Sequence, residues 1–250
     1  MAEPSPGPPI PSPRRHSGER DATLRPAALQ KLLAWLSPSF PVGAYSYSHG
    51  LEWAIEDGTV TDASALEAWI GDILSHGAGR SDAILFCHAW RVTRSGNDDA
   101  VRSIGELAAA FQPSRERHLE ATAQGRAFLL AVAAAWPNER LTALAALFAT
   151  RPITYALAVA LAAAAHDVPL RPALTAMLNG FLANLVSAGV RAIPIGQTDG
   201  QRIIAALSPV ITEVAAAAES QSIDELGGAA LRADIASMKH ETQYTRLFRS

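Results

Sequence analysis

Several residue types and patterns are scarce in this sequence, and each scarcity narrows what the protein can be. Cys87 is the single cysteine among 250 residues, which excludes an internal disulfide framework and fits a reducing compartment. The net charge is only −3, so the chain lacks the broad positive charge of a protein that binds nucleic acid mainly by electrostatics. We therefore expect no nucleic-acid partner.

Long apolar runs are also missing. The longest apolar block, near residues 152–165, is shorter than the roughly 20 residues that a membrane-spanning helix needs. Residues 1–23 contain six prolines and no apolar stretch, so they do not resemble a secretion signal. These observations predict a soluble, cytoplasmic protein without a membrane partner. Because residues 1–23 have too few apolar groups to form a core, we expect them to be a disordered, proline-rich tail.

From Leu24 onward the sequence has helical periodicity. Apolar residues recur at spacings of three and four in nearly every segment, and no segment alternates apolar and polar residues as a strand would. Residues 153–165 are apolar on all sides, which is typical of a helix in the centre of a bundle. The sequence therefore predicts an all-α, single-domain bundle of about ten helices over residues 24–236, followed by a distinct C-terminal segment, residues 237–250.

Local signals predict where several helices begin and end. Either Thr61 or Asp62 is a suitable N-cap for one helix and Ser114 for another, and Asp199 is a plausible N-cap for the helix that carries Ile203. Pro209 should kink that helix or start a new one. Residues 223–238 are expected to form one further helix.

The most unusual segment is residues 37–52, which we call the elbow (SPSFPVGAYSYSHGLE). Its two prolines should stop the preceding helix near Leu36, and Gly43 can turn the chain with a positive φ. An aromatic and hydroxyl run follows and leads into a helix that starts at Leu51. Such an elbow either packs on the core as a simple connection or presents its tyrosines to a partner.

A metal-dependent enzyme is the alternative function. His49 and Glu52 (i, i+3) could share one helix face, and so could Asp72 and His76 (i, i+4). However, the sequence has no His-Glu-x-x-His motif, no paired Glu-x-x-His motifs, no Cys-x-x-Cys motif and no phosphate-binding glycine loop. We therefore expect no catalytic residues, no metal ligands and no cofactor, and favour a binding protein over an enzyme.

The C-terminal segment is the second unusual stretch. After Met238 the apolar stripe of the preceding helix breaks, and Tyr244, Leu247 and Phe248 start a new one between arginines. We expect this segment to add little to the core. It either packs on its own bundle or docks to a partner, and its tyrosine and arginine residues favour docking.

These stretches together resemble the urease accessory protein family UreF. The elbow resembles the family motif Ser-Pro-x-x-Pro-x-Gly-x-Phe/Tyr-Ser-x-Ser-x-Gly-Leu-Glu, residues 193–201 (IPIGQTDGQ) resemble Ile-Pro-Leu-Gly-Gln-x-x-Gly-Gln, and residues 240–250 resemble the usual family ending. The polar run with Glu120 and Arg126 also has a counterpart. The sequence departs from the family at Ala44 (often glycine), at His49 (often glutamine) and in its proline-rich extension.

The resemblance implies an all-helical homodimer that acts as a chaperone in nickel insertion into urease and is not an enzyme. It implies that the protein binds UreD (also called UreH), recruits the GTPase UreG, and engages the urease apoprotein through that complex. The C-terminal segment would order on binding UreD. The candidate partner-binding residues are Tyr45, Tyr47, His49, Glu120, Arg126, Gln197, Gln201, Tyr244, Arg246, Leu247, Phe248 and Arg249.

Overall fold

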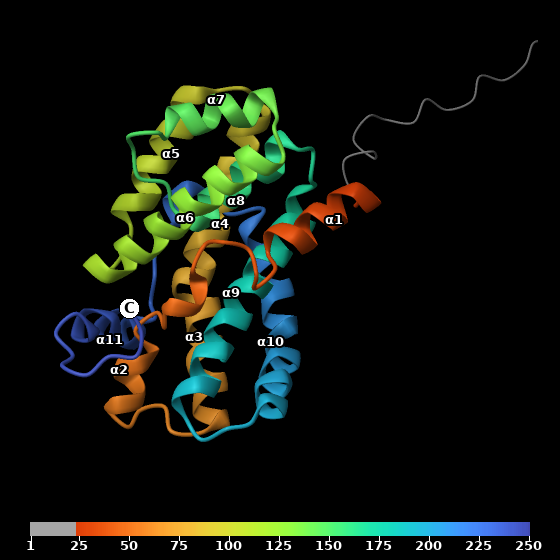
Figure 1. Ribbon diagram of the computed structural model, residues 1–250. Helices are drawn as coiled ribbons and strands as arrows, with labels where there is room; N and C mark the ends of the chain where they lie inside the picture. Colours follow the sequence, from red (N-terminus) through yellow and green to blue (C-terminus); the bar gives the residue numbers. More distant parts are fainter. Residues whose placement is uncertain (1–23) are drawn as a thin grey trace, which may run out of the picture.

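The computed structural model describes residues 24–250, and this part of the chain is all-helical, without any strand. The predicted disordered tail, residues 1–23, lies outside the described residues. Within residues 24–250 there are eleven α-helices and two short 3-10 helices, in agreement with the predicted all-α single domain (Figure 1). In chain order they are α1 (Pro26–Trp35), η2 (Ala44–Ser46), α2 (Leu51–Glu56), α3 (Ala63–His76), α4 (Ala78–Arg94), α5 (Asp98–Ala110), α6 (Arg115–Ala135), α7 (Glu139–Leu147), α8 (Tyr155–Ala165), α9 (Leu170–Ala192), α10 (Gln197–Ala218), η3 (Ile223–Glu225) and α11 (Leu231–His240).

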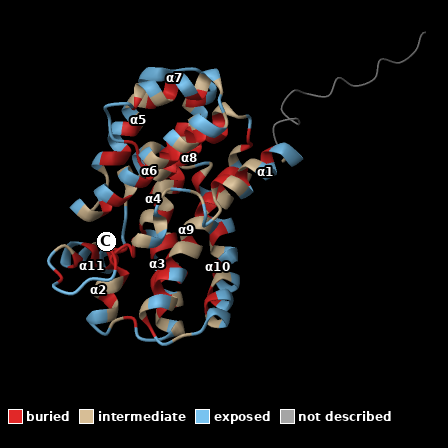
Figure 2. Cartoon of the chain, viewed as in Figure 1, coloured by how far each residue is buried: buried red, intermediate tan, exposed pale blue. Residues whose placement is uncertain are grey.

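The core is built around α8, the helix that the sequence predicted to be central. Every residue from Ala156 to Ala164 is buried, and α8 packs against α4, α6, α7 and α9. Its many alanines let these neighbours approach closely, while Leu157, Val159 and Leu161 fill the space between them. Figure 2 shows the buried positions on the inward faces of the surrounding helices.

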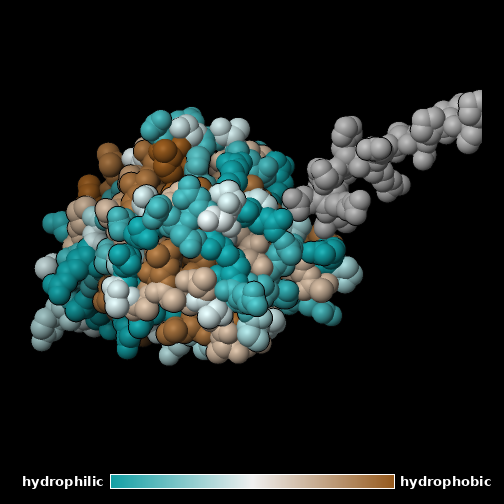
Figure 3. All heavy atoms as spheres, turned by 90° about the horizontal axis from the view of Figure 1, so that it is seen from above, coloured by the Kyte–Doolittle hydropathy of each residue, from teal (hydrophilic) through white to brown (hydrophobic). Residues whose placement is uncertain are grey.

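The lower half of the bundle consists of α3, α9 and α10, and the small helices α2 and α11 lie together at its side (Figure 1). Both α9 and α10 are long and apolar enough to cross a membrane by length and composition. In the structure α9 and α10 pack on each other and on α3 and α4, so their apolar faces contact neighbouring helices of the bundle. Seen from the α5–α7 end, the surface is mostly hydrophilic, with separate apolar patches (Figure 3).

Several predicted helix boundaries are confirmed. The first helix ends at Trp35, the carboxylate of Asp62 accepts the Ala65 N–H at 2.9 Å, and the Ser114 hydroxyl accepts the Arg117 N–H at 3.2 Å. Gly43 has a φ of 71°, the positive value that the turn requires.

Two local predictions are wrong, and one of the two alternatives for Pro209 is wrong. Asp199 is not the N-cap of α10: the cap is Gly196, and the Asp199 carboxylate accepts the Gly196 N–H at 3.2 Å from the first turn. Pro209 does not start a new helix: it lies inside α10, on its exposed side, where water can satisfy the carbonyl group that it leaves free. Residues 223–238 are not one helix, since the chain is pulled away from helical geometry where the Ala229 N–H donates to the His76 carbonyl at 2.7 Å.

Candidate functional site

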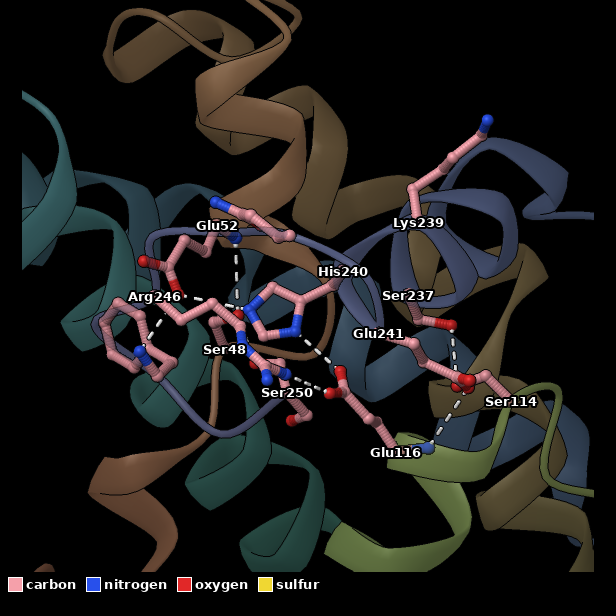
Figure 4. A network of polar contacts seen from close by, with 12 residues as sticks. Ser48, Glu52, Ser114, Glu116, Ser237, Lys239, His240, Glu241, Arg246 and Ser250 are labelled. Carbon is pink, nitrogen blue, oxygen red and sulfur yellow. Dashed lines mark hydrogen bonds and ion pairs between the residues drawn. The ribbon is translucent and has the colours of Figure 1, made fainter.

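The elbow and the C-terminal segment, which are about 200 residues apart in the sequence, meet in the structure (Figures 1 and 4). The Ser48 N–H donates to the Ser250 carbonyl oxygen at 2.6 Å, and the Arg249 N–H donates to the Ser46 carbonyl at 2.8 Å. The Ser48 hydroxyl also donates to the Ser250 carbonyl oxygen. The two backbones therefore run side by side.

Gly50 allows α2 to start directly against α11. Its φ is 76°, and a Cβ atom added there would lie 2.7 Å from the Ser237 backbone nitrogen. Any other residue would be strained by the positive φ and would also collide with the α11 backbone. The glycine of the family-like Gly-Leu-Glu sequence thus fixes the distance between the elbow and the helix that precedes the C-terminal segment.

Glu52, in the first turn of α2, holds the C-terminal segment in place. Its Oε1 accepts the Leu247 N–H at 2.5 Å, and its Oε2 accepts the Phe248 N–H at 2.9 Å. The ring of His240 lies between Glu52 and Glu116, with Nε2 3.1 Å from Glu52 Oε2 and Nδ1 2.6 Å from Glu116 Oε2 (Figure 4). The Arg246 guanidinium donates to the other oxygen of Glu116 at 2.7 Å.

Beneath this network lies a buried polar centre made by His49, Arg117, Glu120 and Ser250. Glu120 forms an ion pair with Arg117 and accepts the Ser250 hydroxyl at 2.5 Å. Burial opposes its charge, but the Arg117 guanidinium holds the pKa of Glu120 well below its ordinary value. Burial, together with Arg117, lowers the pKa of His49 to about 4, so this imidazole is neutral near pH 7. The centre therefore contains one charged pair and a neutral histidine.

A cavity of about 1510 Å³ opens beside the polar centre, between α1, the elbow, α9 and α10. Its walls are mostly apolar and include Leu29 and Leu33 of α1 and Phe181 of α9. Asp82 and Glu120 also line it. Burial raises the pKa of the Asp82 carboxyl to about 6, although Arg117 opposes the change. The cavity can therefore accommodate an apolar group next to a carboxyl group.

The structure divides the candidate partner-binding residues into exposed and buried ones. Tyr45, Tyr244 and Leu247 expose 71%, 102% and 67% of their surface, so they are free to contact another molecule. Arg246 and Arg249 are exposed as well. The buried candidates are Tyr47, His49, Glu120 and Phe248.

The buried candidates pack beneath the surface that carries the exposed ones. Phe248 packs under the Arg191 guanidinium, whose carbon lies 4.6 Å from the ring centre. Since Phe248 and Ser250 are buried, the expectation that the C-terminal segment adds little to the core is wrong. The helical periodicity breaks because residues 241–250 leave the helix and run through turns and bends, in which helical spacing has no meaning.

Three candidates lie away from this cluster. Arg126, on α6, donates to the Ala149 carbonyl at 2.9 Å. Gln197 and Gln201 are exposed in the first turns of α10, and within residues 24–250 neither forms a hydrogen bond to the elbow or to the C-terminal segment. The structure does not bring these three side chains together with Tyr45 or Tyr244.

The two residue pairs of the enzyme alternative, His49/Glu52 and Asp72/His76, have different surroundings. His49 is buried against Phe181, while Glu52 is occupied by the C-terminal segment. Asp72 and His76 are exposed on α3. Among residues 24–250, His, Cys, Asp and Glu side chains form no group of three or more that could hold a metal ion.

Sequence reasoning missed Glu116, Arg117 and His240. The sequence does carry a weak signal for the first two, since the first turns of α6 are unusually polar for a helix that becomes part of the core. His240 had no local signal: its partners are 124 and 188 residues away along the chain.

Comparison with known proteins agrees with the motifs. The family model UreF matches residues 60–208. A urease accessory protein UreF from Rhodopseudomonas palustris (strain BisB18) is 53% identical over 237 residues, which cover 94% of this chain and 98% of the relative. A relative of the same name from Methylobacterium sp. (strain 4-46) is 53% identical over 222 residues, covering 88% of this chain and 87% of the relative. One from Bradyrhizobium diazoefficiens is 49% identical over 229 residues, covering 92% and 94%. The chain therefore belongs to the UreF family of urease accessory proteins.

Proposed function

We propose that this protein is a non-catalytic, cytoplasmic chaperone of nickel insertion into urease, which binds UreD/UreH and recruits the GTPase UreG. The observation that carries the proposal is the joint surface of the elbow and the C-terminal segment. There, Tyr45, Tyr244 and Leu247 project outward from a backbone that Glu52 and Ser48 hold in place. Exposed aromatic side chains beside arginines on a fixed backbone are typical of protein-protein contacts.

In this proposal the C-terminal segment, residues 237–250, is the docking element for UreD. Tyr244 and Leu247 supply the apolar contacts, because residues 24–250 leave most of their surface uncovered. UreG would contact Tyr45 together with Arg246 and Arg249. Tyr47, His49, Glu120 and Phe248 would affect partners only through the positions of these exposed residues.

Further partner contacts and the oligomeric state are part of the same proposal. Arg126, Gln197 and Gln201 are exposed on other sides of the bundle and are proposed as contacts within the larger complex. We also propose that the protein forms a homodimer and meets the urease apoprotein only through the complex. Light scattering coupled to size-exclusion chromatography would test the dimer.

The docking surface is tested by co-purification with UreD, and then with UreG, from the same genome. Deletion of residues 239–250 is a poor test, since it also removes the buried Phe248 and the partners of Glu52. The double variant Tyr244→Ala/Leu247→Ala removes only exposed side chains. We expect its affinity for UreD to fall by at least about thirtyfold while it melts like the wild type, since even one anchor residue contributes roughly 2 kcal/mol or more.

The matched control is Leu130→Ala, which removes a similarly exposed leucine (57%) from α6. It should retain UreD and UreG. Equal UreD binding by wild type and the double variant would refute the proposed docking surface. Failure of the wild type to bind either protein would refute the scaffold function.

A further inference from the structure

Helix α11 presents its largest apolar side chains to solvent instead of to the bundle. Leu231, Ile235 and Met238 expose 65%, 54% and 49% of their surface. They are spaced by four and then three residues, so they form one stripe along the helix, which we call the α11 ridge. Single exposed leucines are ordinary on a protein surface, but three large apolar side chains in line on a ten-residue helix form a contiguous apolar patch.

The face of α11 that packs on the bundle carries only small or polar side chains. Its buried residues are Ala233, Ala236, Ser237 and His240, and the helix packs on α2 and α6 at the side of the bundle (Figure 1). A surface helix of a self-contained bundle turns its large apolar stripe toward the core. In α11 this orientation is reversed, so within residues 24–250 the side chains of α11 with the most apolar area are left uncovered.

The exposed charges near the ridge have one sign. The charged side chains of residues 231–250 that are exposed are all basic: Arg232, Lys239, Arg246 and Arg249. The acidic side chains of this stretch, Asp234 and Glu241, are half-buried. Arg232 and Lys239 are seven residues apart, which is about two helical turns, so both lie on the same side of the ridge. The complementary surface is therefore an apolar groove with carboxylates on its rim.

The ridge also supplies contact area that the C-terminal segment lacks. Tyr244 and Leu247, the apolar contacts of the proposed docking surface, are only two side chains. A stable protein-protein interface buries about 800 Å² of each partner and includes roughly 20 residues or more on each side. Because the chain passes directly from α11 into residues 241–250, the ridge extends the proposed docking surface without a gap in the sequence.

We propose that the α11 ridge is the main apolar anchor for UreD, which receives α11 in an apolar groove rimmed by carboxylates. Helix-in-groove binding uses anchors at i, i+4 and i+7, the spacing of Leu231, Ile235 and Met238. Since α11 contacts its own bundle through small side chains, covering the ridge also stabilises the helix, which agrees with a C-terminal segment that orders on binding UreD. This inference rests on the proposed function, whose docking surface it extends from residues 237–250 to the whole of α11.

The test compares UreD binding by the full-length wild type and by Leu231→Ala/Ile235→Ala/Met238→Ala, the triple variant. Alanine maintains helix propensity, and the change removes only exposed side chains. The affinity for UreD from the same genome should fall by at least about thirtyfold, the effect of one lost anchor residue. The melting temperature and the hydrogen exchange of the Leu247 and Phe248 amides should equal those of the wild type. Unchanged affinity would overturn the proposal.

The matched control is Leu107→Ala/Leu130→Ala, which removes exposed leucines (37% and 57%) from α5 and α6 and should bind UreD like the wild type. A second variant, Arg232→Gln/Lys239→Gln, leaves the ridge intact and removes two exposed charges beside it. Its affinity should fall less steeply with rising salt than that of the wild type, because its attraction to the carboxylate rim is weaker. The same salt dependence in both proteins would overturn the carboxylate rim.

Other occupants of the ridge give different results. If the triple variant keeps UreD but loses UreG, or is monomeric where the wild type is dimeric, the ridge binds that other molecule and the proposal is wrong. If the triple variant keeps UreD while Tyr244→Ala/Leu247→Ala loses it, the inference fails and the proposed docking surface remains. If the triple variant alone loses UreD, the inference stands and the docking surface moves to α11. Failure of the wild type to bind UreD refutes the proposed function itself.

Discussion

The buried polar centre and the neighbouring Asp82 should give this protein an unusual stability profile in mild acid, because His49 and Asp82 act in opposite directions. His49 is buried beside Arg117, and Asp82 lines the cavity near the same guanidinium. The prediction is that Asp82→Asn loses more unfolding free energy than the wild type does as the pH falls.

His49 makes the folded state less stable as the pH falls. Its folded pKa of about 4 lies below the ordinary value of 6.5, so the unfolded chain takes up this proton first. The stability that the neutral ring contributes is therefore complete above pH 6.5 and is lost as the pH falls toward 4. At about 1.4 kcal/mol per pKa unit, the full loss is about 3 kcal/mol.

Asp82 acts in the opposite direction. Burial raises its folded pKa to about 6 from 3.8, so the folded state takes up this proton before the unfolded chain does. Its contribution is lost as the pH rises through 6 and is gained as the pH falls toward 3.8. Because Asp82 is only half-buried and the cavity admits water, screening reduces this gain to roughly 1–2 kcal/mol. The gain offsets part of the loss caused by His49.

The assay is urea unfolding of wild type and Asp82→Asn at a series of pH values from above 6.5 to below 4. Because all other carboxylates titrate equally in the two proteins, the difference between their unfolding free energies isolates Asp82. The variant should lose roughly 1–2 kcal/mol more than the wild type over this range. Asp72→Asn, a change of an exposed carboxylate on α3, should run parallel to the wild type. Parallel curves for wild type and Asp82→Asn would refute the reasoning.

Two further predictions concern the elbow. Gly50→Ala should destabilise the protein by about 2 kcal/mol or more in thermal or urea unfolding, because the added methyl group meets the α11 backbone. Gly43→Ala is the control: its φ is similar but no atom lies within 4 Å, so it should cost only about 1 kcal/mol. Equal losses would show that the close contact with α11 does not matter. Tyr45→Ala should leave the melting temperature unchanged, since the side chain is 71% exposed, but should reduce recruitment of UreG in co-purification; unchanged recruitment would remove this tyrosine from the proposed surface.

Much of the fold could be predicted from the sequence, because local signals decide it. Asp62 and Ser114 cap helices whatever surrounds them, since an N-cap needs only its own side chain and an N–H three residues on. The all-apolar residues of α8 could be placed in the centre because no amphipathic orientation would bury them all. These features depend on short stretches of chain.

Other features depend on distant parts of the chain. The break before α11 follows from a hydrogen bond between Ala229 and His76, which no pattern within residues 223–238 could indicate. The role of His240 depends on Glu52 and Glu116, two residues on other helices. Only the folded bundle brings such groups within hydrogen-bonding distance, so the candidate site could be predicted as two segments but not as one network.

The network changes how the family-like motifs should be interpreted. In the elbow, Ser48 and Glu52 bind the C-terminal backbone, while Tyr45 alone among the elbow candidates is widely exposed. In the C-terminal segment, Phe248 is buried, while Leu247 faces solvent. A motif residue that weakens partner binding when mutated can therefore act by moving its neighbours, because most of the conspicuous side chains hold the backbone rather than contact a partner. For this reason a loss of UreD or UreG binding identifies a contact residue only when amide protection of the C-terminal segment is unchanged in the same variant.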